Sequence, residues 1–350
     1  MRPPFLLGDQ SVAPGSRETL HLTLPEFYTH APATMPMHVI HGRQDGPCVL
    51  ITSTIHGDEI NGVEIVRRLL TQKSINKLHG TLILIPVVNV FGFVSQSRYL
   101  PDRRDLNRSF PGSAKGSMAA RLAFLISQEI LPSCTHVIDL HTGAIGRENL
   151  PQIRTTFPPS GEGSIVDLAL SFNAPVVLDA ALRPGTFRES AHSQGIPSLV
   201  YEAGEALRFD EVSIRAGVTG TLNVLAHLGM IRKRTKRSHS PVIAKSSFWV
   251  RAPQSGVLRS LIALGIRVKK GEVIAYVSDP IGEHEEEITS PAAGIVIGRA
   301  RLPLVHEGEA VFHIASFSQT GNAAEQVVSF QDEFDPETGT PDSDEPPLIG

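Results

Sequence analysis

The most informative residues of this sequence are a histidine and a glutamate that lie three positions apart. His56 and Glu59 fall where an apolar run, 48–55, ends and a helix-like segment begins. An imidazole and a carboxylate at such a corner can both reach one metal ion, and His141, at the end of another apolar run, offers a third ligand. Two histidines, one glutamate and an open fourth position form the ligand set of hydrolytic zinc sites. The sequence therefore predicts a metallohydrolase with one zinc ion per chain.

Two further acidic residues lie at the ends of apolar runs. Asp139 precedes His141 by two residues, so both side chains share one face of the expected strand. A carboxylate in that position can orient an imidazole ligand, although a simple cap of the strand end would explain it too. Glu202 ends another apolar run and can act as a catalytic base. The alternative for Glu202 is a salt-bridged carboxylate.

A loop dense in arginine, from Arg98 to Gly112, follows the strand-like run 80–88. A planar guanidinium binds a carboxylate through two parallel hydrogen bonds, and an adjacent amide can add a third contact. The loop is therefore a candidate site for a substrate carboxylate. For Arg103 and Arg104, a solvated surface position explains the sequence equally well.

The segments that position these residues alternate between strand-like and helix-like from Pro36 to about Gly229. The strand-like runs are 37–41, 48–55, 80–88, 136–140, 174–177 and 198–202. The helix-like segments are 59–72, 117–130, 165–172, 187–194 and 210–228. This alternation predicts an α/β fold with a mainly parallel, mixed sheet flanked by helices. Ligands gather at the carboxyl ends of strands in such sheets, where His56, His141 and Glu202 all fall.

A small all-β domain is predicted from Ser246 to Ser316, where short strand-like runs alternate with glycine turns. Residues 250–258 echo residues 288–296, and residues 268–274 echo residues 305–311. Two similar halves indicate a β-sandwich with quasi-two-fold symmetry, which resembles the biotinyl/lipoyl-type barrel-sandwich hybrid. The hairpin that carries the modified lysine in such carriers corresponds to 279–287, which contains no lysine. We therefore expect a structural module rather than a swinging arm.

The remaining boundaries follow from composition. An N-terminal segment, 1–35, precedes the catalytic domain, 36–231, and a basic linker, 232–245, leads into the β domain. The run 232–237 holds five basic residues and could contact nucleic acid or an acidic partner, but a solvated linker is the favoured interpretation. Residues 317–350 form an acidic tail that we expect to be partly disordered.

Composition restricts the function classes. A chain of 350 residues with 41% hydrophobic and 19% charged residues can hold two globular domains. The net charge of −4 gives no general attraction to nucleic acid or anionic membranes. The N-terminal apolar run is too short for a signal peptide, and no stretch approaches the roughly 20 apolar residues of a membrane span. We expect a cytoplasmic protein with two buried thiols, Cys48 and Cys134, and we leave a homo-oligomer open.

Four motifs, in this order, resemble those of the succinylglutamate desuccinylase/aspartoacylase family, which has the zinc carboxypeptidase fold. They are His56-Gly57-Asp58-Glu59, Asp105-Leu106-Asn107-Arg108, Asp139-Leu140-His141 and the strand that ends at Glu202. The resemblance covers roughly residues 35 to 230, and the appended β domain also fits the family. No single motif is specific, but the four in order with similar spacing are.

The resemblance implies roles for the metal ligands and the base. His56, Glu59 and His141 are similar to the family's zinc ligands, and Glu202 is similar to its general base. The implied reaction is the zinc-dependent hydrolysis of the amide bond of a small N-acyl amino acid that has a free carboxylate.

The resemblance also implies roles in substrate binding. Asn107 and Arg108 resemble the pair that binds the α-carboxylate of the substrate. Arg98 resembles the arginine that polarises the scissile carbonyl. Arg188 is a candidate contact to the side chain of the substrate.

Two other functions fit the same residues. A zinc carboxypeptidase would use the same carboxylate contacts on peptides, and a comparison of peptides with N-acyl amino acids as substrates would distinguish the two. A non-catalytic binding or carrier protein built on the β domain is the second alternative. A metal analysis paired with an activity screen would separate it from an enzyme.

Overall fold

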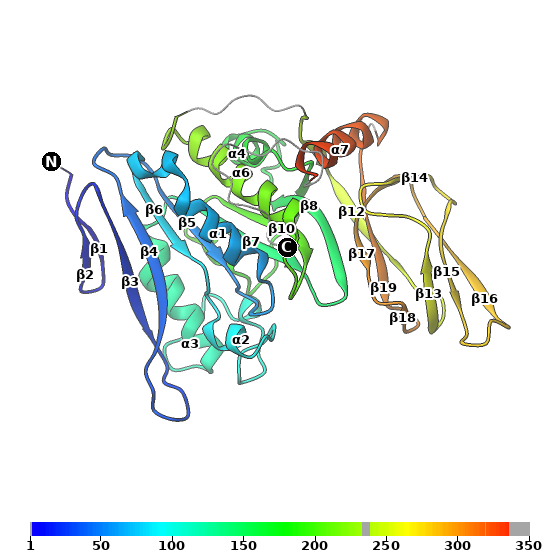
Figure 1. Cartoon of the computed structure of the whole chain (residues 1–350), viewed down its shortest axis with the longest axis horizontal. Coiled ribbons are helices and arrows are strands. Elements are labelled where there is room, and N and C mark those ends of the chain that lie inside the picture. Colours follow the sequence, from blue (N-terminus) through cyan, green and yellow to red (C-terminus); the bar gives the residue numbers. More distant parts are fainter. Residues whose placement is uncertain (1, 233–238, 319, 336–350) are drawn as a thin grey trace.

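The computed structural model describes residues 2–232, 239–318 and 320–335, and a single mixed β-sheet runs through most of the molecule (Figure 1). Along its main path the strands follow one another in the order β12 (Ser246–Arg251), β19 (Ala310–Ser316), β17 (Gly294–Ala300), β8 (Arg147–Thr155), β10 (Ser198–Glu205), β7 (His136–Gly143), β5 (Cys48–Ser53), β6 (Thr81–Ile85), β4 (Ala33–His41) and β3 (Ser16–Leu24). Three short strands pair beside this path: β9 (Val176–Asp179), β11 (Val242–Ala244) and β14 (Arg267–Val268).

The centre of this sheet is parallel and its flanks are antiparallel. Strands β6, β5, β7 and β10 run in one direction, whereas β4 and β8 pair with this block in the opposite direction. Every residue of β5 and β6 is buried, as expected for parallel strands covered on both faces. The sequence prediction of a mainly parallel, mixed sheet is thus confirmed for the part that carries the candidate ligands.

Helices cover both faces of the sheet (Figure 1). The α-helices are α1 (Asn61–Thr71), α2 (Val90–Val94), α3 (Met118–Leu125), α4 (Ser164–Phe172), α5 (Phe187–Ser193), α6 (Glu211–His227) and α7 (Thr320–Phe334). Short helical turns of other kinds are η1 (Lys73–Lys77), η2 (Leu106–Arg108), η3 (Ile126–Ile130) and η4 (Leu131–Ser133). Helices α1, α4 and α6 bury Ile65, Phe172 and Leu222 in one core with the sheet, and α3 and α5 bury Leu122 and Phe187 in another.

The predicted β domain is confirmed, but the linker is not its only connection to the catalytic region. A four-stranded sheet of β16 (Glu285–Thr289), β15 (Val273–Ser278), β13 (Gly256–Ser260) and β18 (Leu304–Val305) packs against β12, β19, β17 and β14. Strand β17 also pairs with β8, with Gly298 opposite Asn149 and Ala300 opposite Arg147. Backbone hydrogen bonds therefore join the β domain to the catalytic region within one sheet.

Both ends of the chain contain more structure than the sequence predicted. The N-terminal segment holds β1 (Phe5–Leu7), β2 (Gln10–Val12) and β3. The tail that the sequence predicts from residue 317 as partly disordered includes the ordered helix α7, which buries Ala323, Val327 and Phe330. This helical spacing of three apolar residues outweighs the acidic composition, because it gives the segment one face that packs against α6.

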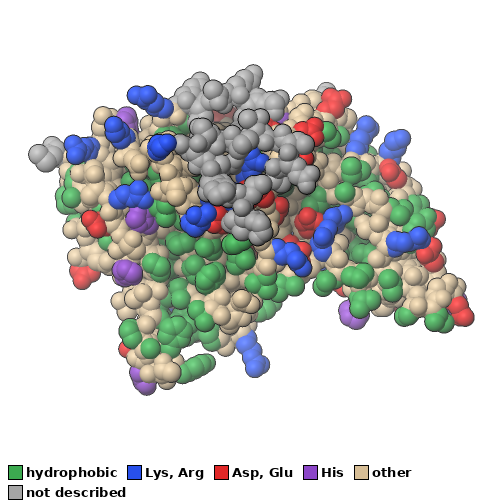
Figure 2. Space-filling view, viewed as in Figure 1, with side chains coloured by type: hydrophobic (Ala, Val, Ile, Leu, Met, Phe, Trp, Pro, Cys, Tyr) green, Lys and Arg blue, Asp and Glu red, His purple; other side chains and the backbone are tan. Residues whose placement is uncertain are grey.

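Two of the predicted segments lie outside the described residues: residues 233–237 of the basic run 232–237, and the end of the tail, 336–350. Within the described part of the chain, none of the helices has the length and apolar character needed to cross a membrane. Figure 2 shows basic and acidic side chains interspersed over the face of the molecule seen in Figure 1.

Candidate metal centre and active site

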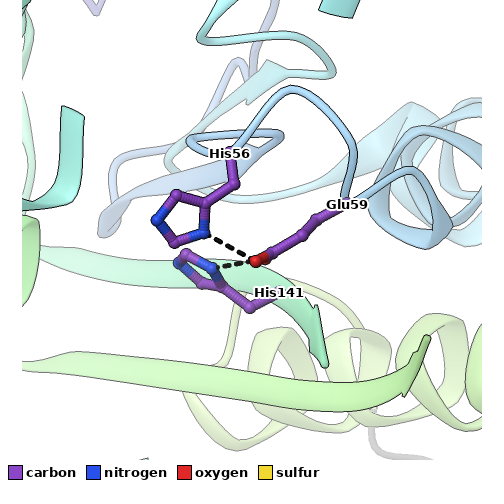
Figure 3. A group of neighbouring side chains, drawn as sticks. All are labelled: His56, Glu59 and His141. Atoms are coloured by element: carbon purple, nitrogen blue, oxygen red, sulfur yellow. Dashed lines mark hydrogen bonds and ion pairs between the residues drawn. The ribbon is translucent and has the colours of Figure 1, made fainter. Parts of the chain in front are cut away.

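Three buried side chains converge at the carboxyl edge of the parallel strands. In Figure 3 the imidazoles of His56 and His141 both point at the carboxylate of Glu59. His56 Nδ1 lies 2.6 Å from Glu59 Oε1, and His141 Nδ1 lies 2.7 Å from Glu59 Oε2. One potential ligand atom from each residue lies within 4.8 Å of the other two. The three residues are therefore arranged so that they could hold a metal ion.

The parallel strands explain why residues distant in the sequence meet here. Strand β7 pairs with both β5 and β10, with Leu140 opposite Ser53 and His141 opposite Glu202. His56 follows β5 after a sharp turn at Thr54, whose φ of 52° is unusual for a residue other than glycine. Glu59 lies in the turn before α1 rather than in the predicted helix, and its carboxylate also accepts the backbone N–H of Thr142 at 3.1 Å.

A second carboxylate holds the far side of each imidazole. Asp105 Oδ1 lies 3.1 Å from His56 Nε2, and Asp139 Oδ2 lies 2.8 Å from His141 Nε2. Asp139 is itself fixed by the hydroxyl of Thr52, which donates to Oδ1 at 2.7 Å. The sequence suggested that Asp139 orients His141, but it did not predict the contact between Asp105 and His56. Carboxylates in these positions fix ring orientation and leave Nδ1 of each histidine for the shared centre.

The carboxylates also change the pKa values of the cluster. Burial opposes protonation of His56, but Glu59 and Asp105 outweigh it, and the pKa rises. For His141, Asp139 and Glu59 outweigh burial in the same way, and the pKa rises well above its usual value. Burial alone would raise the pKa of Glu59, but the two imidazoles lower it instead. The raised pKa values of both histidines show that the surrounding carboxylates favour positive charge at the imidazoles.

The donor set matches zinc better than the hard alkaline-earth ions. Imidazole nitrogen is a preferred ligand of zinc, whereas magnesium and calcium take oxygen ligands. The geometry adds the orienting carboxylates on both histidines that such sites require. A group of two histidines and one glutamate leaves room for substrate and water at the remaining positions.

The centre lies in the wall of a cavity of about 590 Å³. Every residue that the sequence predicted for the site lines it: His56, Glu59, Arg98, Asn107, Arg108, His141, Arg188 and Glu202. Glu202 is 17% exposed; its Oε2 accepts from Asn149 Nδ2 at 2.9 Å, and its Oε1 lies 3.4 Å from Arg154 Nη1. The structure therefore brings all predicted residues together, whereas their individual roles remain predictions.

The arginine-rich loop is fixed on the cavity by Asp105. Its carboxylate accepts the backbone N–H of Asn107 at 2.8 Å and holds Arg98 through Nε and Nη2, at 3.2 and 2.9 Å. Arg98 Nη1 lies 3.3 Å from Glu59 Oε1, directly beside the ligand cluster. The amide oxygen of Asn107 accepts the backbone N–H of Phe187 at 2.8 Å. The Nδ2 group is therefore the part of Asn107 that can donate to a substrate.

Several residues of the cavity were missed by the sequence analysis. Asn149 and Arg154 lie on β8, Arg183 lies in the segment before α5, and Trp249 and His313 come from the β domain. The Trp249 and His313 rings are stacked, with centroids 4.3 Å apart and an interplanar angle of 6°. No local motif marks these positions, because the pairing of β17 with β8 brings the β domain to the cavity.

Gly57 is required for the turn that carries the first two ligands. A Cβ at this position would overlap with the backbone of Gly92 and Phe93 in α2. We expect Gly57→Ala to displace His56 from the centre, with a loss of metal content and a decrease of about 1–3 kcal/mol in unfolding free energy. Metal analysis and thermal unfolding measure both effects. Gly321→Ala is the matched control, because among the residues described a Cβ there meets only Arg267 Nη1, at 3.6 Å. Equal losses in both variants would contradict the assignment.

Residues 45–228, more than half of the chain, match the model of the succinylglutamate desuccinylase/aspartoacylase catalytic domain. The N-alpha-acetyl-L-2,4-diaminobutyric acid deacetylase of Halomonas elongata is 27% identical over 295 residues, which cover 80% of this chain and 85% of that protein.

Two solved structures share the fold over most of their length. A succinylglutamate desuccinylase/aspartoacylase from Rhodobacter sphaeroides is 26% identical with a TM-score of 0.78, covering 86% of this chain and 95% of its own. The ectoine utilization protein EutE (DoeB) from Ruegeria pomeroyi, solved with product bound, is 25% identical with a TM-score of 0.79. That match covers 89% of this chain and 98% of the other.

Proposed function

Because the chain belongs to the succinylglutamate desuccinylase/aspartoacylase family, we propose that it is a zinc-dependent deacylase that hydrolyses the amide bond of an N-acyl amino acid. One observation carries the proposal: His56, Glu59 and His141 converge in the wall of a cavity that Glu202 and Arg108 also line. A metal centre, a candidate base and a candidate carboxylate-binding group are the components that such a reaction needs.

His56, Glu59 and His141 would hold the zinc ion. When bound, zinc lowers the pKa of a coordinated water to about 7 and polarises the carbonyl of the amide. The residues of this chain supply the rest of the chemistry. Glu202, beside His141 in the sheet, accepts the proton of the attacking water and delivers it to the leaving amine. Arg98, beside Glu59, stabilises negative charge on the carbonyl oxygen.

Asn149 and Arg154 support the role of Glu202. They hold its two carboxylate oxygens, at 2.9 and 3.4 Å, so that the side chain keeps one orientation. A base held in place needs no reorganisation when the proton moves, which favours general base catalysis.

The proposed substrate is a small molecule with a free α-carboxylate. Asn107 Nδ2 and the exposed guanidinium of Arg108 would bind this carboxylate and position the amide. The name of the Halomonas elongata relative describes the removal of an acetyl group from the α-amino group of an amino acid. That activity supports an N-acyl amino acid as the substrate class.

The β domain favours a small substrate over a peptide. Ser246, Ser247, Trp249 and His313 line the same cavity as the metal centre, so this domain forms part of its wall. The proposal is tested by measuring hydrolysis of N-acetyl and N-succinyl amino acids by the zinc-loaded protein. Dipeptides and tripeptides with a free C-terminal carboxylate are measured in parallel. Hydrolysis of peptides alone would replace the deacylase with a carboxypeptidase.

We propose a cytoplasmic location for this enzyme. Cys48 and Cys134 are both buried free thiols, which fits a reducing compartment.

Arg108→Ala is expected to weaken substrate binding while the metal content stays unchanged. A hydrogen bond to a charged group contributes roughly 1.5–3 kcal/mol, which corresponds to about 10- to 150-fold in kcat/KM if it persists in the transition state. The contact is tested by a double cycle of kcat/KM values. Wild type and variant are each measured on an N-acyl amino acid and on the same compound with its α-carboxylate converted to an amide. Masking the carboxylate should lower kcat/KM of the wild type by a similar factor. It should lower kcat/KM of the variant little further.

Arg104→Ala is the control for this cycle. Arg104 is an exposed arginine of the same loop that does not line the cavity, so its variant should keep wild-type kinetics. Fully additive losses for Arg108→Ala and the amide would show that Arg108 does not contact the carboxylate.

A further inference from the structure

Asn61 is a buried polar residue that lies two positions after the proposed ligand Glu59 and outside the lining of the cavity. It is the first residue of α1 and is 2% exposed. Its Nδ2 donates to the backbone oxygen of Ala203 at 3.3 Å, and its Oδ1 accepts the backbone N–H of Asp210 at 3.1 Å. Both ends of the amide therefore hold the part of the chain that follows Glu202.

These two hydrogen bonds reach across a strand of the sheet. Strand β7 lies between β5, which leads into the turn with Glu59, and β10, which carries Glu202. Because β5 and β10 are not neighbours in the sheet, their ladders do not fix the distance between the ligand turn and the proposed base. Asn61 joins the two directly, beyond the end of β7.

The contact falls where β10 becomes irregular. The pairing of β10 with β7 is regular up to Glu202, and its register then shifts by one residue before Glu205. Within this step Gly204 has a φ of 74°, and a Cβ there would lie 2.6 Å from Asn61 Nδ2. Such a bulge turns the strand and changes the direction in which neighbouring side chains point. The backbone beside Glu202 is thus shaped to fit closely against the Asn61 amide.

We propose that Asn61 is a positioning residue, which holds the irregular end of β10 against the metal-ligand turn and thereby aims the Glu202 carboxylate at the metal centre. This inference rests on the proposed deacylase function, in which Glu202 is the base. A general base must lie at hydrogen-bond distance from the water that it deprotonates. Asn149 and Arg154 hold the two carboxylate oxygens, whereas Asn61 holds the backbone from which the side chain projects.

Other contacts keep the two segments together when the amide is removed. The backbone N–H of Leu207 donates to the backbone oxygen of Asp58 at 2.8 Å. Arg68 of α1 donates to both carboxylate oxygens of Glu211, at the start of α6, at 2.6 and 2.8 Å. Variants at Asn61 should therefore fold and change only the local course of β10.

Asn61→Ala should lower kcat by about 10- to 100-fold, because a displacement of the base by roughly 1 Å is enough for such a loss. Zinc content and KM should stay those of the wild type, since Asn61 lies outside the ligand group and the cavity lining. Asn61→Asp keeps the shape of the side chain and the acceptor for Asp210, but it replaces the donor that faces Ala203 with an oxygen. It should show the same loss in kcat, and thermal unfolding verifies that both variants are folded.

A double-mutant cycle with Glu202→Gln tests whether Asn61 acts through the base. In the Glu202→Gln background, Asn61→Ala should lower the remaining kcat by less than about 2-fold, because no base is left to misplace. A residue that only stabilises the fold would change kcat by the same factor in both backgrounds.

Asn223→Ala is the matched control for loss of a side-chain amide. Asn223 lies on α6, donates to the backbone oxygen of Phe172 at 3.5 Å and does not line the cavity. Its variant should keep the wild-type kcat.

The outcomes separate this inference from the proposed function. Where the wild type hydrolyses N-acyl amino acids and Glu202→Gln strongly lowers kcat, the proposed function stands. In that case a wild-type kcat in either Asn61 variant, equal losses in both backgrounds, or loss of zinc from a folded Asn61 variant would each show that Asn61 does not position Glu202. If the zinc-loaded wild type hydrolyses no N-acyl amino acid, or if Glu202→Gln keeps the wild-type rate, the proposed function or its base is wrong and the inference is wrong with it.

Discussion

His141→Ala is expected to lose both the bound zinc and the hydrolysis of N-acyl amino acids. The substitution removes one of three proposed ligands and leaves Glu59 and Asp139 as buried carboxylates without their imidazole partner. Loss of a residue that merely orients a ligand costs about 10- to 100-fold in metal affinity or activity, so loss of the ligand itself should exceed about 100-fold. Zinc per chain, measured by elemental analysis, and kcat/KM on the preferred substrate test the expectation.

His136→Ala is the matched control on the same strand. His136 is partly exposed, its Nδ1 contacts the hydroxyl of Thr135, and it does not line the cavity. This variant should keep its zinc and its activity. His56→Ala provides a second, independent removal of a ligand, and thermal unfolding verifies that each variant is folded. Full zinc content in both folded ligand variants would refute the metal centre.

The sequence predicted the metal centre because its residues lie at the ends of apolar strands. Strands β5, β7 and β10 each carry buried apolar residues, such as Leu50, Ile138 and Leu199, and parallel strands in one sheet end at the same edge. Polar residues near the ends of these strands, such as His56, His141 and Glu202, must therefore meet. The sequence did not predict the exact start of α1. A glutamate such as Glu59 has a similar local preference for the turn before a helix and for the first turn of the helix.

The cavity residues Arg147, Asn149 and Arg154 could not be predicted, because they lie on β8. The sequence of this strand, Arg-Glu-Asn-Leu-Pro-Gln-Ile-Arg-Thr, is polar and contains Pro151, both of which argue against a strand within a sheet. Five consecutive residues, 149–153, are nevertheless buried. Gln152 donates to the backbone oxygens of Leu150 and Ile297, at 3.3 and 3.2 Å. The strand exists because β10 and β17 pair with it from both sides, and such long-range pairing leaves no local signal.

Helix α7 shows the opposite case, in which the signal was present but composition obscured it. Ala323, Val327 and Phe330 follow a helical period, and all three are buried. The neighbouring acidic, Pro- and Gly-rich segment favoured a tail as the interpretation. Periodicity reports which face can be buried, whereas composition averages over both faces, so the period was the better guide for these residues.

Glu202→Gln is expected to keep the zinc and to lose turnover. The side chain is not among the proposed ligands, so the metal centre should stay intact. An amide has nearly the same shape as a carboxylate, and its oxygen can still accept the hydrogen bond from Asn149. It cannot accept a proton from water at neutral pH, and a general base typically contributes about 100- to 10,000-fold. We therefore expect a loss of that size in kcat, with zinc content and substrate Kd close to those of the wild type.

Glu205→Gln makes the same chemical change three residues further along β10, and it separates the role of Glu202 from a general effect of lost charge. Glu205 accepts the backbone N–H of Gly146 at 2.9 Å and does not line the cavity. Its variant should turn over at nearly the wild-type rate. If Glu202→Gln also turned over at nearly the wild-type rate, another group would have to be the base. If it lost zinc as well as activity, Glu202 would have to support the metal centre itself, because removal of a base alone leaves the ion in place.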